Sequence, residues 1–134
     1  MTAGDGRRRI AGRSPFEPLI GYSRAVVDAD GWVFVSGTTG AGTDGAMPPD
    51  VETQCANALA TIAAALAEAG AGFGDVRRVR YIVPEARDFE PCWPQLRAAF
   101  GEARPAATMI VAGLIDPAMR IEIEVTARVS PARA

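Results

Sequence analysis

The sequence predicts a single domain of the α/β class, in which helices pack against a β-sheet. Segments rich in Val and Ile with period-two alternation are interleaved with segments whose apolar residues recur at helical spacing. The chain has 134 residues, 49% of them hydrophobic, which is enough for one core but not for a catalytic domain plus a cofactor domain. We therefore expect a flexible N-terminal tail over 1–13 and one domain over 14–134.

The N-terminal half predicts a hairpin followed by a helix. Tyr22–Asp28 and Trp32–Gly37 are rich in β-formers and are joined by a turn signal at 28–31. Asp50 can cap the helix that follows, and Gly70 can end it. Its apolar residues recur at helical spacing and should lie on the sheet: Val51, Cys55, Leu59, Ile62 and Leu66.

The C-terminal half predicts three strands and a second helix. Val76–Val83 alternates as a strand with Val79, Tyr81 and Val83 on one side and Arg78 and Arg80 on the other. A helix should begin near Glu90-Pro91, provided that Pro94 falls within its first turn. Its expected packing set is Phe89, Trp93, Leu96 and Phe100. Residues 104–114 and 120–129 are the last two strand candidates.

The run 120–129 separates two kinds of side chain. Ile121, Ile123 and Val125 share one face, whereas Arg120, Glu122 and Glu124 share the other, because side chains two apart in a strand point the same way. By periodicity alone this polar face would simply meet water.

Composition excludes several functional classes. The net charge is −2, and the basic cluster Arg7–Arg9 reads as a solvated arm, so we expect no nucleic-acid surface. The absence of histidine argues against a metal site, and we expect no cofactor. No run is apolar enough to span a membrane and no secretory signal is visible, so we expect a cytoplasmic protein. Cys55 and Cys92 fall at apolar helix positions and read as reduced packing residues.

One motif match is rejected. Residues 40–45, GAGTDG, fit the dinucleotide fingerprint literally. A true fingerprint opens its helix within the glycines, whereas here Pro48 and Pro49 precede the helix, and the segment lacks the lysine of a phosphate loop. We read it as a mobile loop.

Five segments together carry a family resemblance. They are GYSRAVVDADGWVFVSG (21–37), QCANALATIAAALAEAG (54–70), DVRRVRYIVPEARDF (75–89), RPAAT (104–108) and IEIEVTA (121–127). In this order they resemble the RidA family, also called YjgF or L-PSP, small trimers that hydrolyse reactive enamines and imines. The resemblance covers about residues 14–130. It implies a chorismate-mutase-like fold: a mixed sheet with two helices on one face, closed as a homotrimer around a central barrel.

The resemblance also implies site residues. In RidA-like deaminases the first carboxylate of the IEIE-type strand positions the water that attacks the imine carbon, and Glu122 matches it. Tyr22 matches a tyrosine near the pocket, while Ser36 and Gly37 match the loop whose backbone lines the cleft. Without the resemblance, Glu122 would be an ordinary surface carboxylate and Tyr22 a residue that packs on the sheet.

Two positions depart from the family pattern. The motif that should read Pro-Ala-Arg-(Ser/Thr) reads Pro-Ala-Ala-Thr, so Ala107 replaces the arginine that clamps the substrate carboxylate; Thr108 and Met109 complete this substrate-binding segment. Trp93 stands where deaminases often carry asparagine. Its indole ring either lines the pocket or packs in the core with the second helix. Losing a bidentate guanidinium should cost about ten-fold to several hundred-fold with carboxylated substrates. Aromatic walls favour apolar or π-rich ligands instead.

Two other arginines are considered as replacements. Arg104 lies three positions before Ala107, so on a strand it would face the other way, about 10 Å along the chain. Arg120 lies two residues before Glu122 and would share its face.

Three functions remain open. The first is a trimer that binds or converts a small uncharged or aromatic metabolite at subunit interfaces, with Glu122 as acid/base. The second is a conventional imine/enamine hydrolase with a substitute arginine. The third is a non-catalytic interaction trimer or the ribonuclease of the L-PSP name, and the ribonuclease fits poorly with no histidine and a negative net charge.

Overall fold

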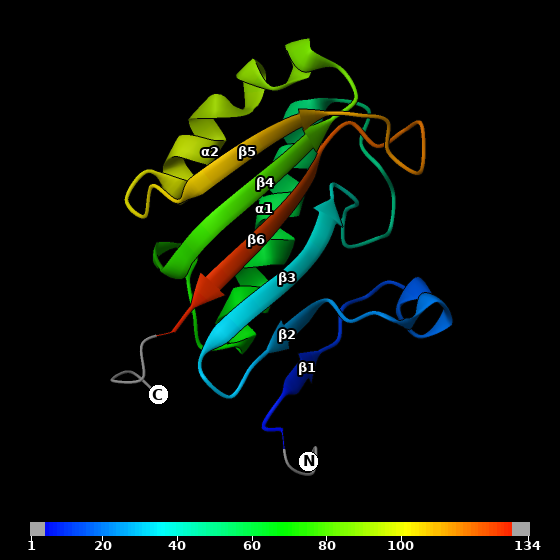
Figure 1. Cartoon of the computed structure of the whole chain (residues 1–134). Coiled ribbons are helices and arrows are strands. Elements are labelled where there is room, and N and C mark those ends of the chain that lie inside the picture. Colours follow the sequence, from blue (N-terminus) through cyan, green and yellow to red (C-terminus); the bar gives the residue numbers. More distant parts are fainter. Residues whose placement is uncertain (1–4, 130–134) are drawn as a thin grey trace.

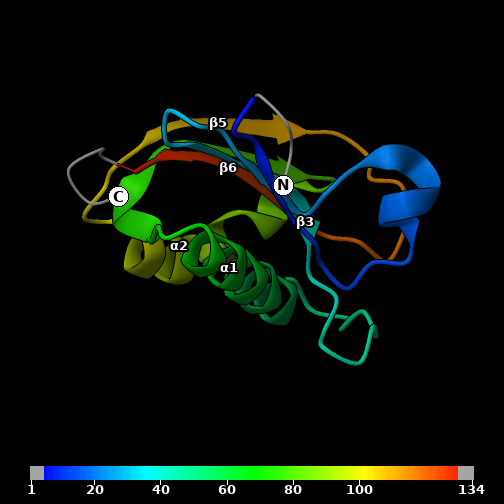
Figure 2. The same cartoon turned by 90° about the horizontal axis from the view of Figure 1, so that it is seen from below.

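The computed structural model describes residues 5–129 and shows one six-stranded sheet with the order β1-β2-β3-β6-β4-β5 (Figure 1). Its elements are β1 (Arg8–Ile10), η1 (Glu17–Gly21), β2 (Ala25–Val27), β3 (Trp32–Thr39), α1 (Val51–Glu68), η2 (Phe73–Asp75), β4 (Val76–Val83), η3 (Ala86–Asp88), η4 (Glu90–Cys92), α2 (Trp93–Phe100), β5 (Ala106–Val111) and β6 (Glu122–Arg128). β4 and β5 are parallel and the other pairs are antiparallel. Both α1 and α2 cover the same face of the sheet (Figure 2), which confirms the predicted mixed sheet with two helices on one face.

The predicted hairpin forms between β2 and β3. The Asp28 amide donates to the Trp32 carbonyl at 2.8 Å, and Gly31 adopts φ 98°, a conformation that only glycine reaches cheaply. The register shifts between Val35 and Thr38 where β3 pairs with β6. This irregularity bends the strand and re-aims the residues within it.

Helix α1 begins and ends where the sequence predicts. The carboxylate of Asp50 accepts from the Thr53 amide at 2.9 Å, which satisfies one free amide of the first turn. Gly70 terminates the helix at φ 80°. The side chain of Arg8 donates to the Glu68 carbonyl at 3.2 Å, so β1 helps to cap α1. The predicted N-terminal tail thus contains a strand, and Ile10 within it is buried; residues 1–4 of that tail lie outside the described residues.

The second helix differs from the prediction at its start. A short 3₁₀ helix, η4, occupies 90–92, and α2 follows with Pro94 in its first turn as required. Leu96 and Phe100 are buried as expected, but Trp93 is 50% exposed. The alternative that Trp93 packs in the core is therefore wrong, because at the first helical position its ring lies outside the buried stripe.

Helix and sheet meet in a continuous apolar core. Cys55 of α1 and Cys92 of η4 are fully buried and not bonded to each other, which confirms their packing role. Tyr81 of β4 contacts the Phe89 ring at 5.1 Å between centroids. No helix within residues 5–129 is long and apolar enough to cross a membrane.

The glycine-rich segment is packed rather than loose at its first glycine. A Cβ on Gly40 would overlap the Cα and Cβ of Gln54 in α1, and the Gly40 carbonyl accepts from the Asn57 side chain at 3.0 Å. The prediction of a mobile loop is therefore wrong at Gly40, where glycine is needed for close approach to a helix.

Candidate functional site

Glu122 opens β6 with its side chain on the face of the sheet that the helices leave uncovered. It pairs with Thr39 of β3 and Ile82 of β4, while its neighbours Ile121 and Ile123 are buried on the helix side. The Glu122 carboxylate is half-buried and makes no hydrogen bond or ion pair with any residue of the described range 5–129. Two residues on, Glu124 is paired with Arg80 at 3.1 Å. Of the two carboxylates on this face, Glu122 is the one free to act on a ligand.

Gly37 leaves the space that the carboxylate of Glu122 occupies. A Cβ added to Gly37 would come within 2.5 Å of Glu122 Oε2, so only a glycine leaves room for the carboxylate in this position. The bulge between Val35 and Thr38 creates this approach, and the buried Thr38 hydroxyl fixes it by donating to the Ser36 carbonyl at 2.7 Å.

The surroundings of Glu122 favour its neutral form. Burial raises the pKa of its carboxyl, the negative charge of Glu124 raises it further, and the Arg24 guanidinium opposes both. A raised pKa brings a carboxyl closer to the range in which it can both take and return a proton, as an acid/base group must.

Arg24 is the cation of this site, and the sequence reasoning missed it. Its guanidinium donates to the Gly37 carbonyl at 2.8 Å and lies over the Tyr22 ring, 6.0 Å from the ring centre. Its Nε is buried and has no partner within residues 5–129. The signal for it in the sequence is an arginine within the predicted strand Tyr22–Asp28, immediately before the residues that form β2, where burying an unpaired charge is costly.

Three predicted binding residues gather around Arg24 and Glu122. Ser36 donates its hydroxyl to the Ser23 carbonyl at 2.7 Å, so it holds the β2 entry against β3. Tyr22 is half-buried, and its hydroxyl lies 3.3 Å from Ser14 Oγ. With Gly37 they form one group beside Glu122, which we call the Glu122 site.

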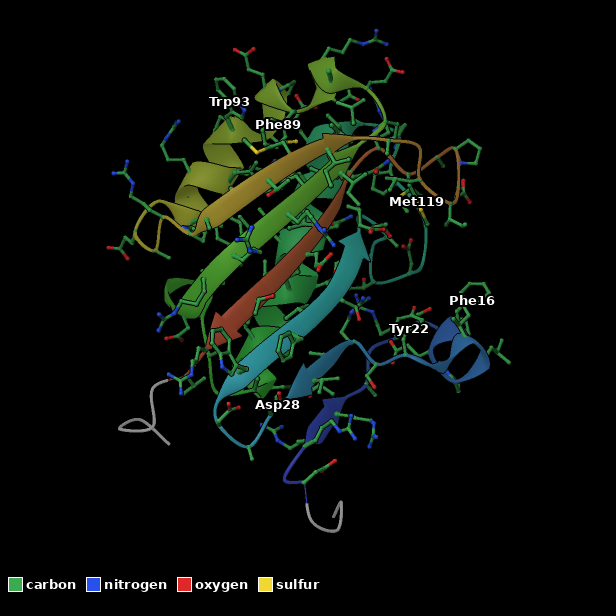
Figure 3. The ribbon with its side chains drawn as sticks, in the orientation of Figure 1. Phe16, Tyr22, Asp28, Phe89, Trp93 and Met119 are labelled. Carbon is green, nitrogen blue, oxygen red and sulfur yellow. The ribbon has the colours of Figure 1, made fainter. Side chains whose placement is uncertain are left out.

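The remaining predicted residues form a second group at the β5 edge. β4 lies between β6 and β5, and Ala107 pairs with Val79, so it shares the helix face of the sheet and points away from the face of Glu122. Met109 lies on the same face as Ala107 and is 57% exposed, whereas Thr108 faces the other way, beside Arg80. Figure 3 shows Trp93 and Tyr22 well apart in the molecule. One protomer therefore does not bring the two groups together.

Comparison with known proteins identifies the family. The family model described as endoribonuclease L-PSP matches residues 12–129. The chain belongs to this family. A Mycobacterium tuberculosis structure, described as a member of the highly conserved YjgF/YER057c/UK114 family, is 37% identical with a TM-score of 0.82, covering 92% of this chain and 99% of that one. A YjgF-family structure from Neisseria meningitidis is 28% identical with a TM-score of 0.76, covering 91% and 93%. An uncharacterized Streptomyces coelicolor protein is 34% identical over 124 residues, 90% of each chain.

The two arginines considered as replacements for the family arginine at position 107 are both engaged or placed differently from the prediction. Arg120 binds Asp88 through two hydrogen bonds of 2.9 and 3.1 Å and also donates to the Pro49 carbonyl. These contacts occupy its guanidinium, which is therefore not free to bind a ligand beside Glu122. Arg104 lies before β5, not on a strand, and it lines the same pocket as Ala107. The expectation that Arg104 faces away from Ala107 is therefore wrong.

The structure offers little to a metal ion. Within residues 5–129 no three His, Cys, Asp or Glu side chains are grouped to hold one.

Proposed function

We propose that this member of the L-PSP family hydrolyses a small enamine- or imine-type metabolite, with Glu122 as the acid/base. The supporting observation is the half-buried, unpaired Glu122 carboxylate with its raised pKa, in a space that the glycine at position 37 leaves open. As a base it would take a proton from a water molecule as the water oxygen bonds to the imine carbon. As an acid it would return that proton to the nitrogen, which gives a carbinolamine. It would then take the proton of the carbinolamine hydroxyl and pass it to the same nitrogen, so that the C–N bond breaks, ammonia or an amine leaves and the carbonyl forms.

We further propose that the complete cleft lies between subunits of a homotrimer. In one protomer the Glu122 site is separated by β4 from the second group around Ala107, Thr108, Met109 and Trp93. All members of the second group lie at the exposed edge of the described sheet or at the start of α2. A neighbouring copy that brings this edge to the Glu122 site would unite both groups.

The charge of the substrate distinguishes two candidates. Ala107 offers no guanidinium and Trp93 exposes an indole ring, which favours an uncharged or aromatic metabolite. The second candidate is a conventional 2-imino acid deaminase, and Arg24 is the observation that favours it. Arg24 already contacts Gly37 and acts on Glu122 electrostatically, so it could orient a substrate carboxylate in place of the missing arginine.

The test compares two substrates. One is a 2-imino acid generated freshly by an amino-acid oxidase, with the residual imine trapped as its semicarbazone; the other is benzophenone imine, a neutral aromatic imine. Glu122→Gln should abolish turnover of whichever substrate is used, while Glu124→Gln on the same strand should keep most of it. If Glu122→Gln turned over both substrates like the wild type, the proposal would be overturned.

Variants of Arg24 separate the two candidates. If the substrate carries a carboxylate, Arg24→Gln should raise KM by about ten-fold or more for the 2-imino acid and leave benzophenone imine nearly unaffected. Preference for benzophenone imine, unchanged by Arg24→Gln, would instead support the uncharged or aromatic class.

A further inference from the structure

The chain has two cysteines, and the fold brings them together on the helix side of the sheet. Cys55 lies in α1 and Cys92 ends η4, and both are fully buried free thiols in the continuous apolar core. Glu122 lies on the opposite face of the sheet. The thiol pair therefore takes no part in the proposed hydrolysis.

The sulfur of Cys92 lies against the turn of α1 that carries Cys55. Its thiol donates to the Val51 carbonyl at 3.9 Å and is 3.6 Å from the Asp88 carbonyl. In an α-helix the Val51 carbonyl also accepts from the amide four positions on, which belongs to Cys55. The two thiols hydrogen-bond each other as well. Rotation of the two side chains is then enough to bring the sulfurs to bonding distance.

The two thiols differ in acidity. The hydrogen bond from Cys55 lowers the pKa of the Cys92 thiol, while burial and the negative charges of Glu52 and Asp88 oppose this shift. The same hydrogen bond raises the pKa of the Cys55 thiol, and burial raises it further. Because the thiolate is the form that attacks an oxidant, Cys92 is the nucleophile of the pair.

Cys92 is also the thiol that a small molecule can reach more easily. It is buried beneath η4, a turn of only three residues that no side chain caps. The residues around it in the sequence are exposed, namely Glu90, Pro91 and Trp93. Short 3₁₀ turns at the surface open at low cost, whereas Cys55 lies within a helix of 18 residues. Brief opening of η4 would admit a small oxidant to Cys92 while α1 stays folded.

We propose that Cys55 and Cys92 form a peroxide-sensitive dithiol that closes to a disulfide within one chain. The Cys92 sulfur attacks one oxygen of hydrogen peroxide, the O–O bond breaks, and the other oxygen leaves as water with the thiol proton, so that Cys92 becomes a sulfenic acid. The Cys55 sulfur then bonds to the Cys92 sulfur as the S–O bond breaks, and that oxygen leaves as a second water with the Cys55 proton. The two thiols lose two electrons and the peroxide gains them. This chemistry requires neither Glu122 nor hydrolysis, so it goes beyond the proposed function.

The test uses the reduced full chain in its native assembly, with hydrogen peroxide as the probe. After treatment and removal of the peroxide with catalase, the chain is denatured and alkylated with N-ethylmaleimide. The disulfide predicts a single chain that is two hydrogens lighter, with neither thiol alkylated and with tryptic peptides 25–77 and 88–97 linked to each other. Dithiothreitol should reverse all of these changes. Thiols that stay open to alkylation, cross-links between chains, or sulfinic acids without linked peptides would each overturn the proposal.

Urea unfolding of the oxidised chain tests whether the fold holds the two sulfurs in position. A disulfide that fits the native structure restricts only the unfolded chain, so the midpoint of unfolding should rise and should return with dithiothreitol. A lower midpoint would show that the bond distorts the core, and it would contradict a pair arranged by the fold.

Single-cysteine variants separate the roles of the two thiols. In Cys55→Ala, peroxide should convert Cys92 to a sulfenic acid that dimedone traps, with no linked peptides. In the matched Cys92→Ala, Cys55 lies within an intact helix, and its modification should be at least about ten-fold slower. Equal rates would overturn the role of Cys92 as the attacking thiol. The peptide mapping on the wild-type chain is independent of how either variant folds.

Discussion

Gly37 and Gly40 lie three residues apart, yet an added methyl group would meet different neighbours at each. At Gly37 the nearest atoms all belong to the flexible Glu122 side chain, whereas at Gly40 they include backbone atoms of α1 at Gln54. We predict that Gly37→Ala changes the free energy of unfolding by less than about 1 kcal/mol but displaces the carboxylate, so turnover falls. Gly40→Ala should cost about 2 kcal/mol or more, because a packed helix cannot yield.

Urea unfolding and turnover, measured on both variants, check this pair of outcomes. Each variant is the control for the other, since the substitution is identical. A strongly destabilised Gly37→Ala, or one with full turnover, would contradict the contact between Gly37 and Glu122.

The raised pKa of Glu122 makes a prediction about stability and pH. The pKa of Glu122 is higher in the folded chain than in the unfolded chain. At acid pH the carboxyl is neutral in both states and does not lower the free energy of unfolding. As the pH rises through the folded pKa, the carboxyl ionises in its half-buried position and stability is lost. Glu122→Gln should therefore be more stable than the wild type at pH 7, and this difference should shrink as the pH falls through the folded pKa and be largely gone below about 4.5, the usual glutamate value. Unfolding free energies at pH 4 and pH 7 test it; a less stable Glu122→Gln at pH 7 would refute it.

At the residue scale, sequence could predict which side of β6 carries Glu122 but not what surrounds it. Alternation alone places Ile121 and Ile123 inside and Glu122 outside. The contact with Gly37 depends on a bulge, and the role of Arg24 depends on that same bulge, so neither has a periodic signal. The separation of Ala107 from Glu122 depends on which strand lies between them, which spacing along the chain does not reveal.

At the element scale, Arg120 joins three segments where β6 begins. Its guanidinium holds Asp88 of η3 and the Pro49 carbonyl before α1, and its amide donates to the buried Gln54 side chain at 2.8 Å. Arg120→Met should lower the free energy of unfolding by about 2–4 kcal/mol, because it strands the buried Asp88 carboxylate.

The matched control for Arg120→Met is Arg87→Met. Arg87 also forms an ion pair, with Glu85 at 3.5 Å, but both of these side chains are largely exposed, so the loss should stay within about 0.5 kcal/mol. Chemical denaturation of the two variants checks the contrast, and equal losses would mean that the Asp88 pair contributes no more than a surface contact.

Elements with strong local signals were predictable and short ones were not. α1 has a cap, a periodic apolar stripe and a terminating glycine, and these agree on its bounds at Val51 and Glu68. β1 has three residues, too few for a pattern, and it exists because it can pair with β2. Helix α2 starts at Trp93 because 90–92 form a tighter turn first, which leaves the indole outside the core.

At the scale of the whole molecule, one face of the sheet carries no helix (Figure 2). Phe34 on that face is 44% exposed, and the edge strand β5 exposes Met109 and Val111. An uncovered face together with an apolar edge strand is unusual for a protein that stays monomeric. Association of copies would cover both and would complete the cleft proposed above.

We predict that the protein sediments at three times its chain mass of 14.0 kDa and that Phe34→Lys shifts it towards the monomer. A lysine on the uncovered face would place a charge in the contact between copies, where it is costly unless paired. Ala64→Lys on the exposed side of α1 adds the same charge and should leave the mass unchanged. Turnover should fall with the trimer, since the Glu122 site would lose the second group. A wild-type monomer that hydrolyses imines would contradict the interface cleft while leaving Glu122 as its acid/base.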